Sequence, residues 1–253
     1  MHSNADLIAV ALPLPAYDVV IPCYNRAHVV ADAVASVLAQ DHAPTRVVVV
    51  DDGSADNSAS VIRALEAAHP ERVIGALLPR NEGASNARNV GAALCRSPWI
   101  AFLDSDDVWL PGAARALLRG GEDGADVVCG HFARVEGDGT PGPAECGWWG
   151  DDIRTALTHG GVIGPSWAIV RRAIVEDVGG FDPSFHNCND WDFFTRAAAA
   201  AAIFRRIDDV VALYRTVAGD RLVNDTDIGA QNARRILLHP YLLGANRLAP
   251  RVD

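Results

Sequence analysis

Carboxylate side chains gather at one point in the first half of this sequence. Asp104, Asp106 and Asp107 lie within four consecutive residues, separated only by Ser105 and preceded by the apolar run 99–103. Carboxylates this close repel one another unless a positive charge offsets them, and hard divalent cations prefer oxygen ligands. The pattern indicates an Mn²⁺ or Mg²⁺ site that also binds substrate phosphates, and the open alternative is a solvated acidic turn.

Two further polar clusters follow earlier apolar runs. Asp51 and Asp52 come after the run 46–50, where an acidic side chain can accept hydrogen bonds from a base or a ribose. An Asx-turn before the next helix is the alternative. Tyr24, after the run 18–21, offers a ring for stacking on a nucleobase, or else belongs to a capping segment.

A glycine turn precedes the acidic motif. Asn81 and Gly83 begin the segment 81–89, which combines a turn with the start of a predicted helix. Backbone N–H groups at a helix start can face a phosphate, and Arg88 can pair with it. A purely structural role for this segment stays open.

A second acidic pair lies in the other half of the chain, at the start of a predicted helix. A carboxylate at a helix N-terminus is stabilised as the anion, and a general base must be ionised and reach the nucleophile. Asp190 suits that role, Asp192 is the alternative, and an N-cap is the structural reading. Aromatic faces suit sugar rings or other flat, apolar-faced groups, so ligand contacts or else core packing are expected from Trp148, Trp149, Trp167, His186 and Trp191, with Asp192 beside them.

The spacing of apolar residues predicts the elements that position these groups. Strands are expected at 18–21, 46–50, 72–78, 99–103 and 126–132, and helices at 27–40, 58–68, 86–95 and 111–118. Alternating strands and helices predict a parallel sheet with right-handed crossovers. Ligands bind beyond the carboxyl ends of such strands, so the first three clusters are expected to meet along one sheet edge.

The second half is less regular. Loops are expected at 136–149, and further elements at 166–170 (strand), 171–178 (helix), 190–202 (helix), 210–214 (strand) and 227–238 (helix), followed by a tail.

Composition narrows the class of protein. The 253 residues are 49% hydrophobic without a linker-like stretch, which favours one compact domain over 1–253. The net charge of -10 argues against a nucleic-acid partner. No apolar run reaches the ~20 residues of a membrane span. Five widely spaced cysteines without a C-x-x-C pair indicate reduced thiols and a cytoplasmic protein.

With these residues in place, the sequence resembles the inverting, nucleotide-sugar-dependent glycosyltransferases of family 2. The matching segments, in chain order, are 19–26, 48–54, 81–91, 102–111, 179–182 and 189–192, followed by Arg196. The resemblance implies an α/β protein of the GT-A fold, with a Rossmann-like, mostly parallel central sheet flanked by helices and a smaller mixed acceptor-side region. Residues 15–132 would form the nucleotide-sugar-binding half, and residues 133–253 the acceptor-binding half with a C-terminal helix and tail.

The resemblance also implies site roles. Asp106 would contact the metal, with Asp104 nearer the ribose, and Asp190 would be the catalytic base of a single displacement that inverts the sugar. The donor would be a UDP- or dTDP-sugar, with GDP possible, and the acceptor a small molecule or glycan. The donor-binding residues would be Pro22, Tyr24, Asn25, Asp52, Asn81, Gly83, Arg88, Asp104 and Ser105.

Two positions depart from the family pattern. Asn189 stands where relatives often carry Glu, and Val217 follows Tyr214 and Arg215 where many carry His. The Q-x-x-R-W motif of processive synthases is absent, which favours single transfer. The competing hypotheses are a sugar-nucleotide nucleotidyltransferase, whose Gly-rich loop after the first strand is missing here, and a degenerate binding module.

Overall fold

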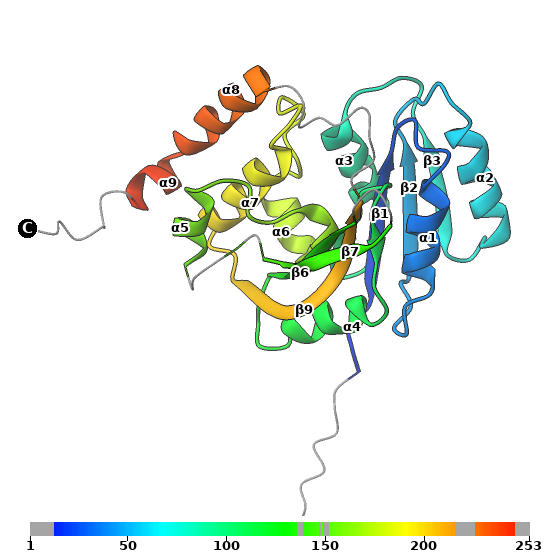
Figure 1. Cartoon of the computed structure of the whole chain (residues 1–253), viewed down its shortest axis with the longest axis horizontal. Helices are drawn as coiled ribbons and strands as arrows, with labels where there is room; N and C mark the ends of the chain where they lie inside the picture. The colour runs from blue at the N-terminus through cyan, green and yellow to red at the C-terminus, as the bar shows by residue number, and fades with distance from the viewer. Residues whose placement is uncertain (1–12, 136–138, 147, 149–151, 216–225, 246–253) are drawn as a thin grey trace, which may run out of the picture.

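The computed structural model describes residues 13–135, 139–146, 148, 152–215 and 226–245, which are built around one nine-stranded sheet (Figure 1). The strands are β1 (Tyr17–Cys23), β2 (Arg46–Asp51), β3 (Val73–Leu77), β4 (Trp99–Phe102), β5 (Val108–Trp109), β6 (Val127–Val135), β7 (Pro141–Glu145), β8 (Ala168–Arg171) and β9 (Phe204–Arg215). The described helices are α1 (Val30–Leu38), α2 (Ser58–Ala68), α3 (Ala84–Leu94), α4 (Ala113–Gly120), α5 (Ile153–Leu157), α6 (Arg172–Asp177), α7 (Asn189–Ala199), α8 (Thr226–Leu237) and α9 (Pro240–Ala245), with a 3₁₀ turn at Pro165–Trp167.

The sheet is mixed but mostly parallel. Its order is β3-β2-β1-β4-β8-β6-β9-β5, with β7 paired to β6. β1 to β4 run parallel, β8 runs against them, and β6 and β9 return to the first direction. The predicted α/β class, with a mostly parallel sheet flanked by helices, is confirmed.

The two faces of β1 pack into two different cores. Val19 and Ile21 face the core covered by α1, α2 and α4, while Val20 faces the core formed with α3, α6 and α7. Alternating residues of a strand point to opposite faces. Both faces are covered, and the middle parts of β1 (19–21) and β2 (47–50) are uninterrupted Val/Ile runs, which is typical of buried parallel strands.

The first strand continues through Pro22, beyond its predicted end at residue 21. Pro22 pairs in register with Val50, and β1 continues to Cys23. The carbonyl of Val20 faces the β4 side, where it accepts from the N–H of Leu103. Pro22 shares that orientation, but β4 has ended at Phe102. The missing N–H of the proline therefore falls where no neighbouring strand needs it.

The less regular half differs most from expectation. The segment 136–149, expected as loop, contains β7, an edge strand that pairs with β6 despite its prolines. β9 begins at Phe204 instead of residue 210, and β5, α5 and α9 were not predicted. These elements are short or depend on pairing with remote segments, so local periodicity does not reveal them.

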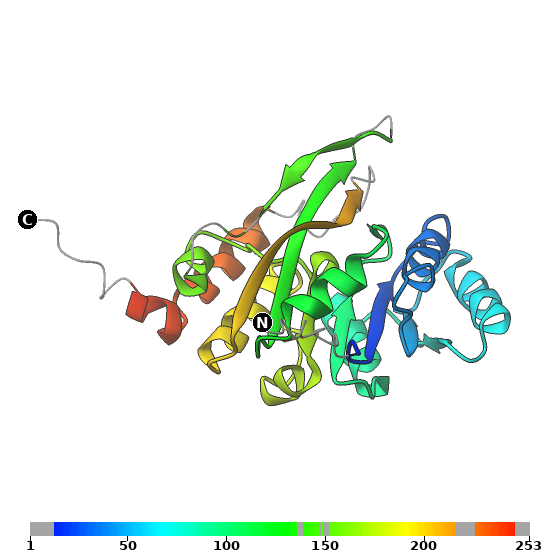
Figure 2. The same cartoon turned by 90° about the horizontal axis from the view of Figure 1, so that it is seen from below.

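The C-terminal helices lie at the end of the molecule opposite β1–β3 (Figure 2). α8 and α9 pack on α7, and α9 also packs on α5. Among the described residues, none of the helices combines the length and apolar composition that a membrane crossing requires. All five cysteines are unpaired thiols.

Candidate functional site

The three polar clusters of the first half meet at one sheet edge, as expected. β1 lies between β2 and β4, and Cys23 is in register with Asp51. The N–H of Asp52 donates to the carbonyl of Cys23 at 2.8 Å. The turns that follow these three parallel strands are therefore neighbours.

Asn25 joins the turn after β1 to the turn after β2. Its φ of 52° is in the left-handed region, which Asn tolerates better than most residues. Its side-chain oxygen accepts from the N–H of Ala55 at 2.9 Å, and its own N–H donates to Ser54 Oγ at 2.9 Å. Tyr24 next to it is 43% exposed, so its ring is free to stack on a ligand.

Asp52 fastens the glycine turn that precedes α3. It is buried, and its two carboxylate oxygens accept from the N–H groups of Glu82 at 2.9 Å and Gly83 at 2.8 Å. Gly83 has a φ of 94°, and Asn81 Oδ1 also accepts from its N–H at 3.1 Å. Asp52 thereby shapes the segment predicted to face phosphate.

Asp51 differs from Asp52 in its hydrogen bonding, a difference that the sequence did not predict. Its side chain is buried, and Oδ1 has no hydrogen-bond partner within the described parts of the chain. A buried carboxylate oxygen without a donor is costly. Of the two neighbouring aspartates, Asp52 is thus committed to the protein, while Asp51 retains an unused acceptor at the same edge.

The acidic motif after β4 divides into different environments. Asp104 Oδ1 lies 2.6 Å from Arg88 Nη2, and Asp106 Oδ2 lies 3.6 Å from Arg26 Nε. The Asp104 and Asp106 side chains are 33% and 17% exposed, so ligands can reach both. Ser105 between them is buried.

Asp107, by contrast, is a structural residue that the sequence did not distinguish. It is buried, accepts from Ser166 Oγ at 2.5 Å and accepts from the N–H of Arg215 at 3.1 Å. Ser166 Oγ also accepts from the N–H of Asp104 at 3.1 Å. Burial, followed by the charges of Asp104 and Asp106, raises the pKa of Asp107 well above its usual range.

A divalent cation fits Asp104 and Asp106 only with help from a substrate. Within the parts of the chain that the structure describes, no group of three or more His, Cys, Asp or Glu side chains is arranged to hold a metal ion. Mg²⁺ typically binds through one or two carboxylates together with waters and substrate phosphates. Two accessible carboxylates at the edge where the sequence predicts phosphate binding match that donor set. Val217, which replaces a possible His ligand, lies outside the described residues.

Asp190 lies on the first turn of α7. The residue directly before this helix is Cys188, whose φ of 57° is unusual for a residue other than Gly, Asn or Asp. Asp190 Oδ1 accepts from the N–H of Trp191 at 2.8 Å. Burial raises the pKa of Asp190, and the charge of Asp104 adds to this, while that N–H and the charge of Arg88 oppose it.

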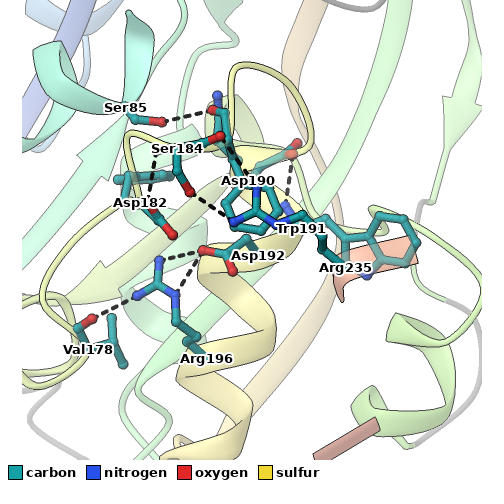
Figure 3. A network of polar contacts seen from close by, with 12 residues as sticks. Ser85, Val178, Asp182, Ser184, Asp190, Trp191, Asp192, Arg196 and Arg235 are labelled. Carbon is teal, nitrogen blue, oxygen red and sulfur yellow. Dashed lines mark hydrogen bonds and ion pairs between the residues drawn. The ribbon is translucent and has the colours of Figure 1, made fainter. Parts of the chain in front are cut away.

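Asp192, the alternative base, is already paired. Its Oδ2 lies 2.7 Å from Arg196 Nη2 and accepts from Arg196 Nε at 2.8 Å, and its side chain is 11% exposed (Figure 3). Both contacts reach the same oxygen, so this ion pair at i, i+4 engages one oxygen of the buried carboxylate. The geometry therefore favours Asp190 over Asp192 for proton transfer.

Arg88 connects the two acidic regions. Its buried guanidinium donates from Nη2 to Asp104 and from Nη1 to Asn189 Oδ1 at 2.9 Å, across 101 residues of sequence. It also lies 5.2 Å from the centroid of the Phe181 ring. The sequence predicted a phosphate partner for Arg88, whereas in the structure it links Asp104 to Asn189, the residue before Asp190.

The aromatic residues expected at the acceptor site are mostly packed inside. Trp148 is 5% exposed and belongs to a core cluster, and Trp191 is buried with Nε1 donating to the carbonyl of Leu157 at 2.8 Å. Trp167 is half-buried and stacks on Phe132 with ring centroids 4.0 Å apart. Of this set, His186 is exposed, and Trp149 lies outside the described residues.

The comparison with curated proteins supports a family assignment. The profile described as Glycosyl transferase family 2 matches residues 18–179. An uncharacterized glycosyltransferase of Nostoc sp. is 32% identical over 65% of this chain and 53% of its own length. Succinoglycan biosynthesis protein ExoU of Rhizobium meliloti is 29% identical over 89% of this chain and 76% of its own length. The match thus spans about half the length of the first relative.

Solved structures share the fold. TarS 1-349 of S. aureus in complex with UDP-GlcNAc has a TM-score of 0.72 at 20% identity, covering 88% of this chain and 67% of that chain. The mannosyltransferase PcManGT of Pyrobaculum calidifontis, in complex with GDP-Man and Mn²⁺, has a TM-score of 0.63 at 20% identity, covering 93% and 65%. The expected GT-A fold is confirmed. Because the family profile extends from β1 to just beyond α6, over more than half of the sequence, the chain belongs to glycosyl transferase family 2.

Proposed function

We propose that this chain is a glycosyltransferase that moves a sugar from a nucleotide-diphosphate sugar to a hydroxyl of a small-molecule or glycan acceptor, with inversion and in single transfers. The observation that carries the proposal is the Arg88 bridge, which brings the Asp104–Asp106 edge and the Asp190 helix to one place. A donor-side carboxylate pair and a base on separate elements form the pattern that such a displacement requires.

The donor would lie beyond β1, β2 and β4. Tyr24 would stack on the base, Asp104 would approach the ribose, and the 81–83 turn held by Asp52 would face the diphosphate. Solved neighbours hold UDP-GlcNAc or GDP-Man, which supports donors of the UDP, dTDP or GDP type.

Asp190 would act as the general base. Burial raises its pKa, which makes its carboxylate a stronger base toward the proton of an acceptor hydroxyl, while the nearby charge of Arg88 opposes that shift. The hydroxyl oxygen then attacks the anomeric carbon as the bond to the diphosphate breaks on the opposite face. That in-line geometry inverts the configuration of the sugar.

A divalent cation would be held by Asp104 and Asp106, and a neighbour with the same fold is solved with Mn²⁺. When bound, Mn²⁺ or Mg²⁺ supplies neutralisation of charge on the diphosphate. The residues of this chain contribute the placement, because Ser166 fixes both the backbone of Asp104 and the side chain of Asp107. A cytoplasmic location remains a prediction based on the cysteine pattern.

A thermal unfolding screen tests the proposal. The purified chain is heated with UDP, dTDP, GDP, ADP or CMP, each with and without Mn²⁺ or Mg²⁺. Ligand present at a hundred times its Kd stabilises the native state by about 2.7 kcal/mol. We expect one nucleotide to raise the melting temperature only with metal.

Matched variants locate the binding site in that screen. Asp106→Ala should remove the metal-dependent shift, whereas Asp177→Ala, at an exposed aspartate on α6, should retain it. Stabilisation by none of the nucleotides would favour a binding module without donor recognition. An undiminished shift in Asp106→Ala would show that the metal binds without Asp106.

A further inference from the structure

The loop at 181–188 carries the chain into α7 and the proposed base, and two distant helices hold it. From α3, Asn89 Nδ2 donates to the carbonyl of Phe181 at 2.7 Å and its Oδ1 accepts from the N–H of Phe181 at 2.8 Å. Ser85 Oγ on the same helix donates to the carbonyl of Phe185 at 3.4 Å. These contacts tie the loop to the donor side.

The second support comes from α8, near the end of the described chain. Asn232 is 4% exposed, and its Nδ2 donates to Asn187 at both the backbone oxygen (3.2 Å) and Oδ1 (2.7 Å). Asn187 is itself buried. A buried amide with two acceptors on one loop residue fixes that residue in position and orientation.

Arg235, one turn further along α8, holds the preceding part of the loop. Its guanidinium donates to Ser184 Oγ at 2.9 Å and to the carbonyl of Ser184 at 3.4 Å (Figure 3). It also lies 4.0 Å from the centroid of the Phe185 ring, within cation–π distance. Arg235 Nη1 is 3.4 Å from Asn232 Oδ1, so the two side chains form one unit.

The held loop ends in a strained residue directly before the helix. Cys188 has a φ of 57°, and a non-glycine residue in this region persists only where its surroundings enforce it. Its carbonyl accepts from the N–H of Asp192 at 3.0 Å, which begins α7. The direction in which α7 starts therefore depends on the contacts that α8 makes to Ser184 and Asn187.

We infer that Asn232 and Arg235 are positioning residues for Asp190, acting through the 181–188 loop and the strained turn at Cys188. The inference rests on the proposed function, in which Asp190 is the base. Proton transfer and in-line attack require near-contact geometry, and misplacement by about 1 Å can cost a hundredfold in rate. The residues proposed for the nucleotide lie in the turns after β1, β2 and β4 and in the segment 81–88 at the start of α3, none of them on α8.

Three variants on α8 test the inference. Asn232→Asp keeps the shape of the side chain but removes the amide N–H donors, and Arg235→Ala removes the contacts to Ser184 and Phe185. Arg234→Ala is the matched control, because Arg234 is the adjacent, exposed arginine of the same helix. The wild type is first assayed for consumption of UDP-GlcNAc and of GDP-mannose, and the variants are then assayed with the donor that it consumes. Nucleotide affinity and amide exchange of residues 181–192 are measured for each protein.

We expect kcat to fall about tenfold in Asn232→Asp and Arg235→Ala, with donor KM and nucleotide affinity within twofold of the wild type. Arg235→Lys, which keeps a cation over Phe185, should recover part of the rate. Amide exchange in 181–192 should become faster in both damaging variants and stay unchanged in Arg234→Ala. A purely structural role would lower stability without separating kcat from KM.

The outcomes separate this inference from the proposed function. An active wild type with turnover in Asn232→Asp and Arg235→Ala equal to that in Arg234→Ala overturns the positioning role and leaves the transferase intact. A wild type that neither binds nucleotide nor consumes a donor contradicts the proposed function and, with it, the assignment of Asp190. In that case faster exchange of 181–192 would still establish the hold of α8 on the loop, and unchanged exchange would remove it.

Discussion

The β1–β4 region and the β6–α9 region bring polar groups to the site in different ways. In the first, each cluster directly follows its own strand, and the parallel register of β1, β2 and β4 sets the clusters side by side. In the second, the place of Asp190 depends on remote partners. Asn189 is held by Arg88 across 101 residues, and Asn187 by Asn232 across 45. The residues of the proposed donor site are thus placed by local sequence, and the proposed base by long-range contacts.

The largest effect is expected from replacing Asp190, the proposed base in the second region. Asp190→Asn should lower transfer about a thousandfold, within the range that general bases contribute, while nucleotide affinity stays within twofold. The measurement is release of nucleotide diphosphate, with Asp177→Asn as the control at an exposed aspartate. Normal turnover in Asp190→Asn would show that the base lies elsewhere, with Asp192 the next residue to test.

The second-largest effect is expected when Arg88, which links the two regions, is replaced. Arg88→Ala leaves Asp104 without its cation and Asn189 without its donor, and breaking such a partly buried pair costs about 3 kcal/mol. We expect a lower melting temperature and a loss of turnover of about a hundredfold. Arg80→Ala, at an exposed arginine paired with Glu82, should change stability by less than about 0.5 kcal/mol. Equal effects of the two variants would contradict the bridging role.

Within the acidic motif, neighbouring aspartates should separate stability from binding. Asp107→Ala removes acceptors for Ser166 and Arg215 and should lower stability by about 2 kcal/mol. Asp106→Ala should leave the melting temperature of the ligand-free chain nearly unchanged but weaken metal-dependent nucleotide binding at least about tenfold. Denaturant unfolding and calorimetric titration measure the two quantities. The reverse pattern would exchange their roles.

The smallest effect concerns pH. Because burial raises the pKa of Asp190 above its usual 3.8, activity should fall as the pH drops through that raised value. A carboxyl with a raised folded-state pKa stabilises the protein below its unfolded pKa and loses that contribution as the pH rises. Asp190→Asn should therefore melt higher than the wild type at pH 7. An equal or lower melting temperature there would contradict the shift.

The two regions also differ in how far the sequence predicts them. The limits of α2 were predicted to the residue, and β1, β2 and β4 to within two residues, because apolar runs and helical spacing are local signals. The convergence of Tyr24, Asp52 and Asp104 followed from strand order alone.

What stayed hidden depends on tertiary contact. β7 is a strand only because β6 pairs with it, and Asp107 differs from Asp106 only because Ser166 and Arg215 reach it. No local sequence pattern singles out Asn232, because its partner Asn187 lies 45 residues away and meets it only when α8 packs against the loop. Similarly, nothing in the spacing of Trp148 and Trp191 separates an acceptor surface from a core.

The stereochemistry of the released sugar tests the central claim most directly. The donor is an α-linked sugar of the nucleotide that the thermal screen selects, and water is the acceptor. Proton NMR then records the first anomer formed before mutarotation. In-line attack by a hydroxyl activated at Asp190 predicts the β anomer from the wild type and no release above background from Asp190→Asn. Release of the α anomer, or equal release by both proteins, would contradict the account.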